Sequence, residues 1–242
     1  MAGAARWCSS GLYIGDPELQ AWVLGLQGLM YYWEDRLEEA LKYTQAAQAL
    51  PANGTSRGRA ICLHGRVLGR QGRLREATET LSEAHRHRES RDVLDPLPGV
   101  FAFPVQKELY WAASAYEFSS ETSYNQQGQQ AAEEAIGFYE ASAPGEVRIG
   151  ELSLARLELA AARWRNGVLD GASAAVEVVF NDLQHRRVES VCRRLERLAQ
   201  GLGLRTADKC PEQSALRERI REYLVAPKAS KTTARRRRSR KI

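Results

Sequence analysis

The chain has few of the side chains that hold metals or form cross-links. Its 242 residues include four cysteines and four histidines. The cysteines are Cys8, Cys62, Cys192 and Cys210. None has the CxxC spacing of a zinc site, and their scatter indicates reduced thiols rather than a disulfide framework. His85 and His87 are two residues apart, which places them on different faces of a helix. The sequence therefore predicts no metal site.

Long apolar runs and catalytic motifs are also lacking. No apolar stretch reaches the roughly 18 residues that cross a bilayer, and the first residues lack the order of a secretory signal. We therefore expect a cytoplasmic protein without a membrane partner. The sequence contains no GxSxG, Walker, GxGxxG or HExxH motif. Paired carboxylates such as Glu38-Glu39 and Glu133-Glu134 fit solvated helix faces. We expect neither an enzyme nor a cofactor.

Excess positive charge is confined to the end of the chain. The net charge is +5, and residues 228–241 carry eight Lys or Arg side chains and no acid, so subtracting them leaves about −3 for residues 1–227. Residues 227–242 have nothing to bury and are predicted to be disordered. This basic tail includes Arg235, Arg236, Arg237 and Arg238. Such a run binds polyanions weakly and with steep salt dependence, or it serves only to solvate the chain end.

What the chain does contain is a near repeat of itself after 37 residues. The segment 28–47, GLMYYWEDRLEEALKYTQAA, is echoed at 65–84 by GRVLGRQGRLREATETLSEA. The matched small residues are Gly28 and Gly65, Ala40 and Ala77, and Ala47 and Ala84. This pattern resembles the tetratricopeptide consensus in slightly longer units. One hairpin buries too little apolar surface to be stable, so we predict stacked α-α hairpins in an all-α, right-handed superhelix, an α-solenoid.

Turn signals divide the chain into successive hairpins. Asp16-Pro17 is typical of a helix start, and Gly72 and Asn166-Gly167 are typical of breaks between helices. The predicted hairpins cover 16–54, 55–88, 107–142 and 146–183, and two capping helices follow, so the repeat domain spans 16–226. A longer connection, RDVLDPLPGVFAFP, precedes the third hairpin. We expect its apolar GVFAF segment to pack back on the array.

Three segments resemble a known family. They are DPELQAWVLGLQGLMYYWEDRLEEAL, GVFAFPVQKELYWAA and ELSLARLELAAARWRNGVLDGA. They are similar to the C-terminal region of actinobacterial helix-turn-helix transcriptional regulators of the XRE type, over residues 16–204. The GVFAFP element is the more specific match because generic repeats lack it. The resemblance implies a tetratricopeptide-like regulatory region that binds a ligand or partner and self-associates, for example as a homodimer.

The DNA-binding domain of that family has no counterpart in this sequence. Only fifteen residues precede Asp16, too few for a DNA-reading helical domain. We expect residues 1–15 to be the end of an earlier helix or a disordered start. The chain is then either a short paralogue or the product of a start site inside a longer gene. Sequence-specific DNA binding is not carried over in either case.

One helix face of the predicted array gathers arginines and aromatic residues. When Gly28 and Gly65 are set in register, the first helices of the hairpins project these residues onto a concave groove. They are Trp22, Tyr32, Arg59, Arg66, Arg70, Lys107 and Trp111. Guanidinium forks bind carboxylates in pairs, so the predicted ligand is an acidic protein or peptide, or one with a C-terminal carboxylate. The alternative is that the arginines form a solvated face or pair with acids, and that the aromatics belong to the core.

Two functions remain open from the sequence. The favoured hypothesis is a non-enzymatic regulatory module that binds a peptide, protein or small effector in the groove. The alternative is a nucleic-acid accessory protein, in which the repeats form a scaffold and the basic tail contacts phosphate. Binding should depend on the groove residues in the first case and on the tail arginines in the second.

Overall fold

The computed structural model describes residues 15–90, 102–143, 147–184, 186–204 and 210–226. Within these ranges the chain forms ten α-helices and no strand, which confirms the all-α prediction and is consistent with an α-solenoid. In chain order the helices are α2 (Pro17–Trp33), α3 (Leu37–Gln48), α4 (Thr55–Arg70), α5 (Leu74–Glu89), α6 (Val105–Ala115), α7 (Thr122–Glu140), α8 (Ile149–Arg165), α9 (Leu169–Asp182), α10 (Glu189–Leu204) and α11 (Pro211–Val225).

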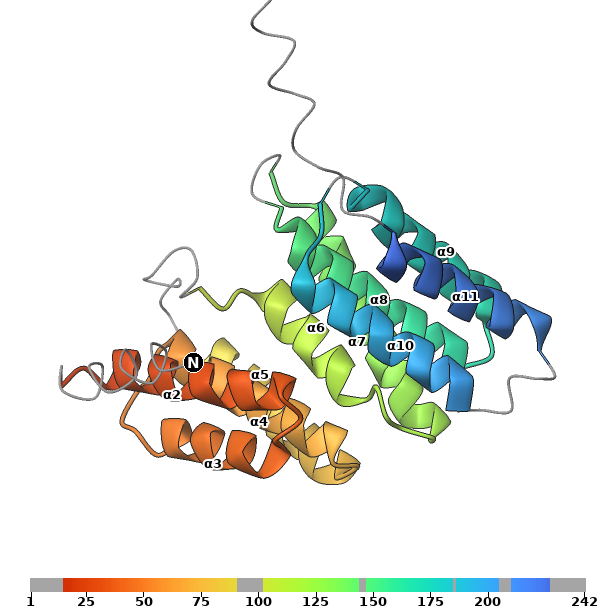
Figure 1. The fold of residues 1–242 in the computed structure, drawn as a ribbon. Helices are drawn as coiled ribbons and strands as arrows, with labels where there is room; N and C mark the ends of the chain where they lie inside the picture. Colours follow the sequence, from red (N-terminus) through yellow and green to blue (C-terminus); the bar gives the residue numbers. More distant parts are fainter. Residues whose placement is uncertain (1–14, 91–101, 144–146, 185, 205–209, 227–242) are drawn as a thin grey trace, which may run out of the picture.

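The helices pack in consecutive pairs that follow one another from red to blue in Figure 1. The pairs are α2–α3, α4–α5, α6–α7, α8–α9 and α10–α11. The first members of successive pairs also contact each other, so that α2, α4, α6, α8 and α10 form a continuous layer, which we call the first-helix layer. Within it α4 and α8 are buried on nearly every side. Residues on neighbouring helices of this layer are therefore brought into contact although they lie in different pairs.

Local sequence explains where the first helix begins and how closely the first pairs pack. The Asp16 side chain accepts a hydrogen bond from the Glu18 amide at 2.9 Å and caps the helix whose first residue is Pro17. A Cβ on Gly28 would lie 3.3 Å from the carbonyl oxygen of Ala40, and a Cβ on Gly65 would lie 3.2 Å from that of Ala77. The two close approaches are equivalent, as the repeat predicted.

The third pair differs from its predicted boundaries. Helix α6 ends at Ala115, before the predicted end at Phe118, and α7 begins at Thr122, before the predicted start at Gln129. The chain turns back at Tyr116, whose ring stacks on Tyr124 of α7 at 5.7 Å. The turn leaves Glu117 in the connection between α6 and α7, where it lies near α10.

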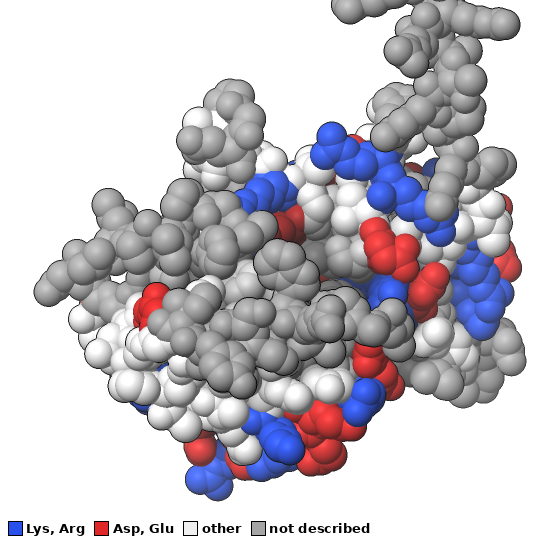
Figure 2. Space-filling model, turned by 60° about the vertical axis from the view of Figure 1, so that its left-hand side comes forward, with Lys and Arg blue, Asp and Glu red and all other residues white. Residues whose placement is uncertain are grey.

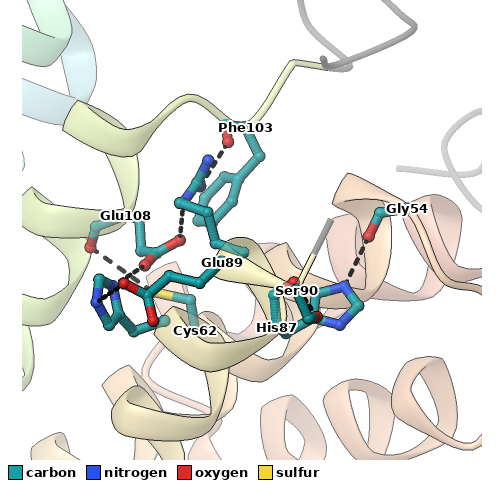
Figure 3. Close-up of polar contacts among 9 residues, drawn as sticks. Gly54, Cys62, His87, Glu89, Ser90, Phe103 and Glu108 are labelled. Carbon is teal, nitrogen blue, oxygen red and sulfur yellow. Dashed lines mark hydrogen bonds and ion pairs between the residues drawn. The ribbon is translucent and has the colours of Figure 1, made fainter. Parts of the chain in front are cut away.

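Polar contacts attach the start of α6 to the second helix pair, as Figure 3 shows. Arg88 Nε donates to Glu108 Oε2 at 2.6 Å, and Arg88 Nη2 donates to the carbonyl oxygen of Phe103 at 2.8 Å. The Phe103 ring is 1% exposed and lies edge-on to Trp111. This end of the GVFAF segment packs back on the helices as predicted, whereas residues 91–101 fall outside the described ranges.

The described surface carries mixed charge. On the face shown in Figure 2, basic and acidic side chains lie beside one another. No helix in the described ranges combines the length and the apolar character needed to cross a membrane. The predictions for 227–242, which include Arg235, Arg236, Arg237 and Arg238, lie outside the described residues. The same holds for 1–14 of the predicted segment 1–15.

Candidate functional site

The structure brings most of the predicted groove residues together, but beneath the surface. They come from α2, α4 and α6, which are adjacent in the first-helix layer. Tyr32 and Trp111 are 0% and 1% exposed. Arg59 and Arg66 are 5% and 1% exposed. Trp22 and the side chain of Arg70 are partly buried. Arg59 and Arg66 therefore lie between helices instead of lining an open groove.

Aromatic rings surround the two buried arginines. The guanidinium carbon of Arg66 lies 4.5 Å from the centre of the Tyr32 ring and 5.6 Å from that of Trp111. The guanidinium carbon of Arg59 lies 5.5 Å from the Trp22 ring and 5.9 Å from Trp111. We call these five residues the arginine–aromatic cluster. The ring faces attract the cations by cation–π interaction, which explains how the arginines are held between α2 and α6.

The two arginines of the cluster lack acceptors for part of their hydrogen-bonding capacity. Among the described residues, Nε of Arg66 and both Nε and Nη1 of Arg59 are buried without a hydrogen-bond acceptor, and the Tyr32 hydroxyl is buried without a partner. Burial lowers the pKa of Arg59. Burial also opposes the charge of Arg66, but the attraction of nearby Tyr and Glu side chains outweighs it and raises the pKa. Buried charged donors without acceptors are costly and mark the cluster as a candidate anion site.

Lys107 has a carboxylate partner outside the cluster. Its Nζ lies 2.8 Å from Glu151 Oε1 on α8, and the Tyr139 hydroxyl donates to Glu151 Oε2 at 3.0 Å. Burial lowers the pKa of Lys107, and the ion pair with Glu151 partly offsets that effect. This predicted groove residue is thus satisfied within the chain and contributes little free positive charge.

Arg194 of α10 is a central residue that the sequence reasoning missed. It is 0% exposed. Its Nε and Nη2 donate to the two carboxylate oxygens of Glu158 at 2.9 and 2.8 Å, and its Nη1 lies 3.0 Å from Glu117 Oε1. The attraction of these carboxylates outweighs burial and raises the pKa of Arg194. The sequence did indicate the burial of Arg194. It lies three residues after Val191 and four before Leu198 in the apolar stripe of α10, so the helical period places all three side chains on the buried face.

Arg197, also missed, links the last helix pair to the first. Its guanidinium carbon lies 5.0 Å from the centre of the Trp33 ring and 5.9 Å from that of Tyr32. The guanidinium carbon of Arg70 lies 5.0 Å from the same Tyr32 ring. Three guanidinium groups thus surround the Tyr32 ring. Those of Arg66 and Arg70 come from α4, and that of Arg197 comes from α10, far away in the sequence. Repeat units usually contact only their neighbours, so this approach of α10 to α2 is a tertiary feature.

A pocket of about 540 Å³ opens beside Arg70 and Arg197. It is bounded by the α2–α3 turn, the end of α4, the α6–α7 connection, the end of α8, and α10. Its walls carry four arginines and two carboxylates. These are Arg70, Arg165, Arg194, Arg197, Asp35 and Glu117. The pocket therefore has an excess of positive charge, which suits an anionic ligand.

Asp35 has an unusual backbone conformation at the edge of this pocket. Its φ is +64°, while Gly72 and Gly167, in the corresponding turns of two later helix pairs, have φ of +79° and +81°. A side chain makes this conformation less favourable than it is for glycine. Asp35 Oδ1 lies 2.8 Å from Arg70 Nη2, and Arg70 Nη1 donates to the carbonyl oxygen of Tyr32 at 2.9 Å. The carboxylate thus fixes Arg70 at the pocket wall.

Acid should weaken the fold through Glu117 and Glu151. Burial alone would raise the pKa of each, but Arg194 and Arg197 at Glu117, and Lys107 at Glu151, outweigh it and hold the pKa below the usual 4.5. A carboxyl group whose pKa is lower in the folded than in the unfolded state stabilises the fold at pH values above its unfolded-state pKa. That stability is lost as the pH falls through the folded-state pKa. We expect urea unfolding to show falling stability below pH 4.5, with a shallower slope in Glu151→Gln. An unchanged slope would contradict this assignment.

The chemistry that the buried arginines offer is charge-assisted hydrogen bonding to an oxyanion. No group of three or more His, Cys, Asp and Glu side chains suited to a metal ion occurs among the described residues. Cys62 is buried, and burial raises the pKa of its thiol well above the usual value, which disfavours a nucleophilic thiolate.

Comparison of the chain with protein-family models, curated proteins and solved structures found no match.

Proposed function

We propose that this chain is a non-enzymatic regulatory module of tetratricopeptide-like helical repeats, and that its first-helix layer binds an anionic peptide, protein or small effector. The module corresponds to the regulatory region of the XRE-type transcriptional regulators that the sequence resembles, acting in the cytoplasm. The observation that carries the proposal is the buried arginine–aromatic cluster, because Arg59 and Arg66 retain donors without acceptors among the described residues.

The energetics of that cluster favour a role in binding over a role in folding. A buried charge without a hydrogen-bonded counterion destabilises the folded state, and an apolar residue of similar volume usually does better. Residues that lower stability in this way are concentrated at functional sites. An acidic ligand would supply the missing acceptors, and the surrounding rings would offer it apolar contact area.

Arg59→Met tests this role directly, because Arg59 has two buried donors without acceptors among the described residues. Methionine retains much of the side-chain volume between Trp22 and Trp111 and removes a charge that burial disfavours, so we expect the melting temperature to rise. Binding of an acidic peptide with a free C-terminal carboxylate should fall by about tenfold or more, since a charge-assisted hydrogen bond is lost. Thermal unfolding and calorimetric titration measure the two effects, with an amide-capped peptide as the matched ligand control.

Arg75→Met is the control variant, because the Arg75 side chain is 88% exposed and pairs only with Glu79 among the described residues. It should change neither melting temperature nor peptide binding appreciably. Peptide affinity equal to wild type in Arg59→Met would contradict the proposed role. A titration with labelled duplex DNA at low and physiological salt tests the alternative function, since a polyanion-binding tail gives binding that falls steeply with salt.

A further inference from the structure

One edge of the Arg197 guanidinium has no hydrogen-bond acceptor. Nε and Nη2, the adjacent donors on that edge, are buried and unpaired within the described residues. Glu117 Oε2 lies 3.9 Å from Nη2, too far for a hydrogen bond, and it also lacks a donor in that part of the chain. Two parallel N–H groups on one guanidinium edge form the fork that binds a carboxylate or phosphate through two oxygens.

The neighbouring acids are already engaged by other arginines. Asp35 pairs with Arg70 at 2.8 Å, and Glu117 Oε1 lies 3.0 Å from Arg194 Nη1. Arg194 in turn holds both oxygens of Glu158. Among the carboxylates of the described residues, Arg197 therefore contacts only the shared Glu117, at the longer distance, and an added oxyanion would give it a counterion of its own.

The pocket that Arg197 lines is also partly apolar. Its walls include Leu37, Phe118, Ala161, Trp164 and Leu198. Phe118 is 44% exposed although it is a large hydrophobic side chain. The volume of about 540 Å³ lies within the range typical of small-molecule sites. An inorganic ion would leave these apolar walls without contacts, whereas an organic body would cover them.

We propose that this pocket binds an organic anion, with one carboxylate or phosphate group held by the Nε and Nη2 edge of Arg197 and an apolar body held against Phe118 and Trp164. The proposal deepens the proposed function and rests on it, because it names a ligand class and a binding residue for the first-helix layer. The Arg197 side chain is 15% exposed and lines the pocket, while its Nε and Nη2 are buried, so ligand binding requires the guanidinium group to turn toward the pocket.

Matched probes test the ligand class with the full-length chain. 2-Naphthoate carries a carboxylate on an apolar body, 2-naphthamide is its neutral counterpart, naphthyl phosphate carries the other oxyanion, and inorganic phosphate lacks the body. Calorimetric titration at constant ionic strength should show naphthoate or naphthyl phosphate binding about tenfold or more tightly than naphthamide and inorganic phosphate. The tighter of the two identifies the preferred oxyanion. Equal affinity for all four probes, or no binding of any at millimolar concentration, overturns the proposal.

Arg197→Gln and Arg197→Lys test the residue. Glutamine should weaken the preferred probe by about tenfold or more, and lysine should restore only part of the loss, because it keeps the charge without the fork. The control is Arg193→Gln, whose side chain is 49% exposed and pairs with Glu189. Wild-type affinity in both Arg197 variants overturns the assignment, and a melting temperature measured for each variant shows that it is folded.

The acidic peptide separates failure of this pocket from failure of the module. If the peptide binds the wild-type chain while the naphthyl probes do not, the regulatory module stands and the pocket assignment is wrong. If the naphthyl probes bind through Arg197 while the peptide does not, the ligand is a small effector and a peptide partner is excluded. If neither class binds, both proposals are overturned.

Discussion

Gly69→Ala is expected to destabilise the protein by at least about 3 kcal/mol. A Cβ at Gly69 would lie 2.7 Å from the carbonyl carbon of Ala115 and closer still to its oxygen. Both residues lie at helix ends, Gly69 in the last turn of α4 and Ala115 at the end of α6, so backbone would have to move to make room. Because Arg70 and Glu117 flank this contact, the same movement would disturb the pocket walls. Urea unfolding measures the loss.

Gly137→Ala is the matched control. Gly137 lies within α7, is exposed, and a Cβ there would meet no atom within 4 Å. Alanine should stabilise the helix by up to about 1 kcal/mol, because it restricts the unfolded chain more than glycine does. If Gly69→Ala unfolded at the same urea concentration as Gly137→Ala, the close approach of α4 and α6 would be wrong.

Arg194→Met should cost about 3–5 kcal/mol, the second large effect. The substitution removes the cation that lies between Glu117 and Glu158, side chains that are 4% and 2% exposed, and leaves both carboxylates buried without their main counterion. These contacts join α10 to α8 and to the α6–α7 connection. We therefore expect looser packing of the last helix pair as well, seen as faster hydrogen exchange in α10 by mass spectrometry.

The adjacent arginine provides a control for charge alone. Arg193→Met removes one exposed i, i+4 pair with Glu189 and should change stability by no more than about 0.5 kcal/mol. Adding Glu158→Gln to Arg194→Met removes one unpaired charge and should recover part of the loss. A small effect of Arg194→Met, similar to that of Arg193→Met, would show that the buried ion contacts do not hold α10 in place.

Helix positions were predictable because their signals are local. Asp16-Pro17 marks a start, Gly72 and Gly167 mark turns with positive φ, and the structure places helix boundaries beside each of them. The connection after α6 carries no glycine or proline signal, and there the predicted boundaries were off by several residues. At that break the Tyr116 ring stacks against Tyr124, a contact formed only when α7 folds back.

The candidate site was predictable only in part. Helical register placed Arg59, Arg66 and Trp111 on one face, and the structure groups them. Register says nothing about which element covers that face, so the burial of Arg66 could not be predicted. Arg197 was missed because its contacts with Trp33 and Glu117 join residues far apart in the chain.

The sequence by itself determined the all-α class, the helix order, the close approach of Gly28 to Ala40 and of Gly65 to Ala77, and the gathering of arginines and aromatic rings on the first helices. Each depends on residue spacing within a few helical turns. Tertiary structure alone decided that α10 approaches α2, that Arg194 pairs with Glu117 and Glu158, and that a pocket forms beside Arg197. Those features depend on how each helix pair is rotated and displaced relative to the pair before it. No local periodicity in the sequence specifies those rotations and displacements.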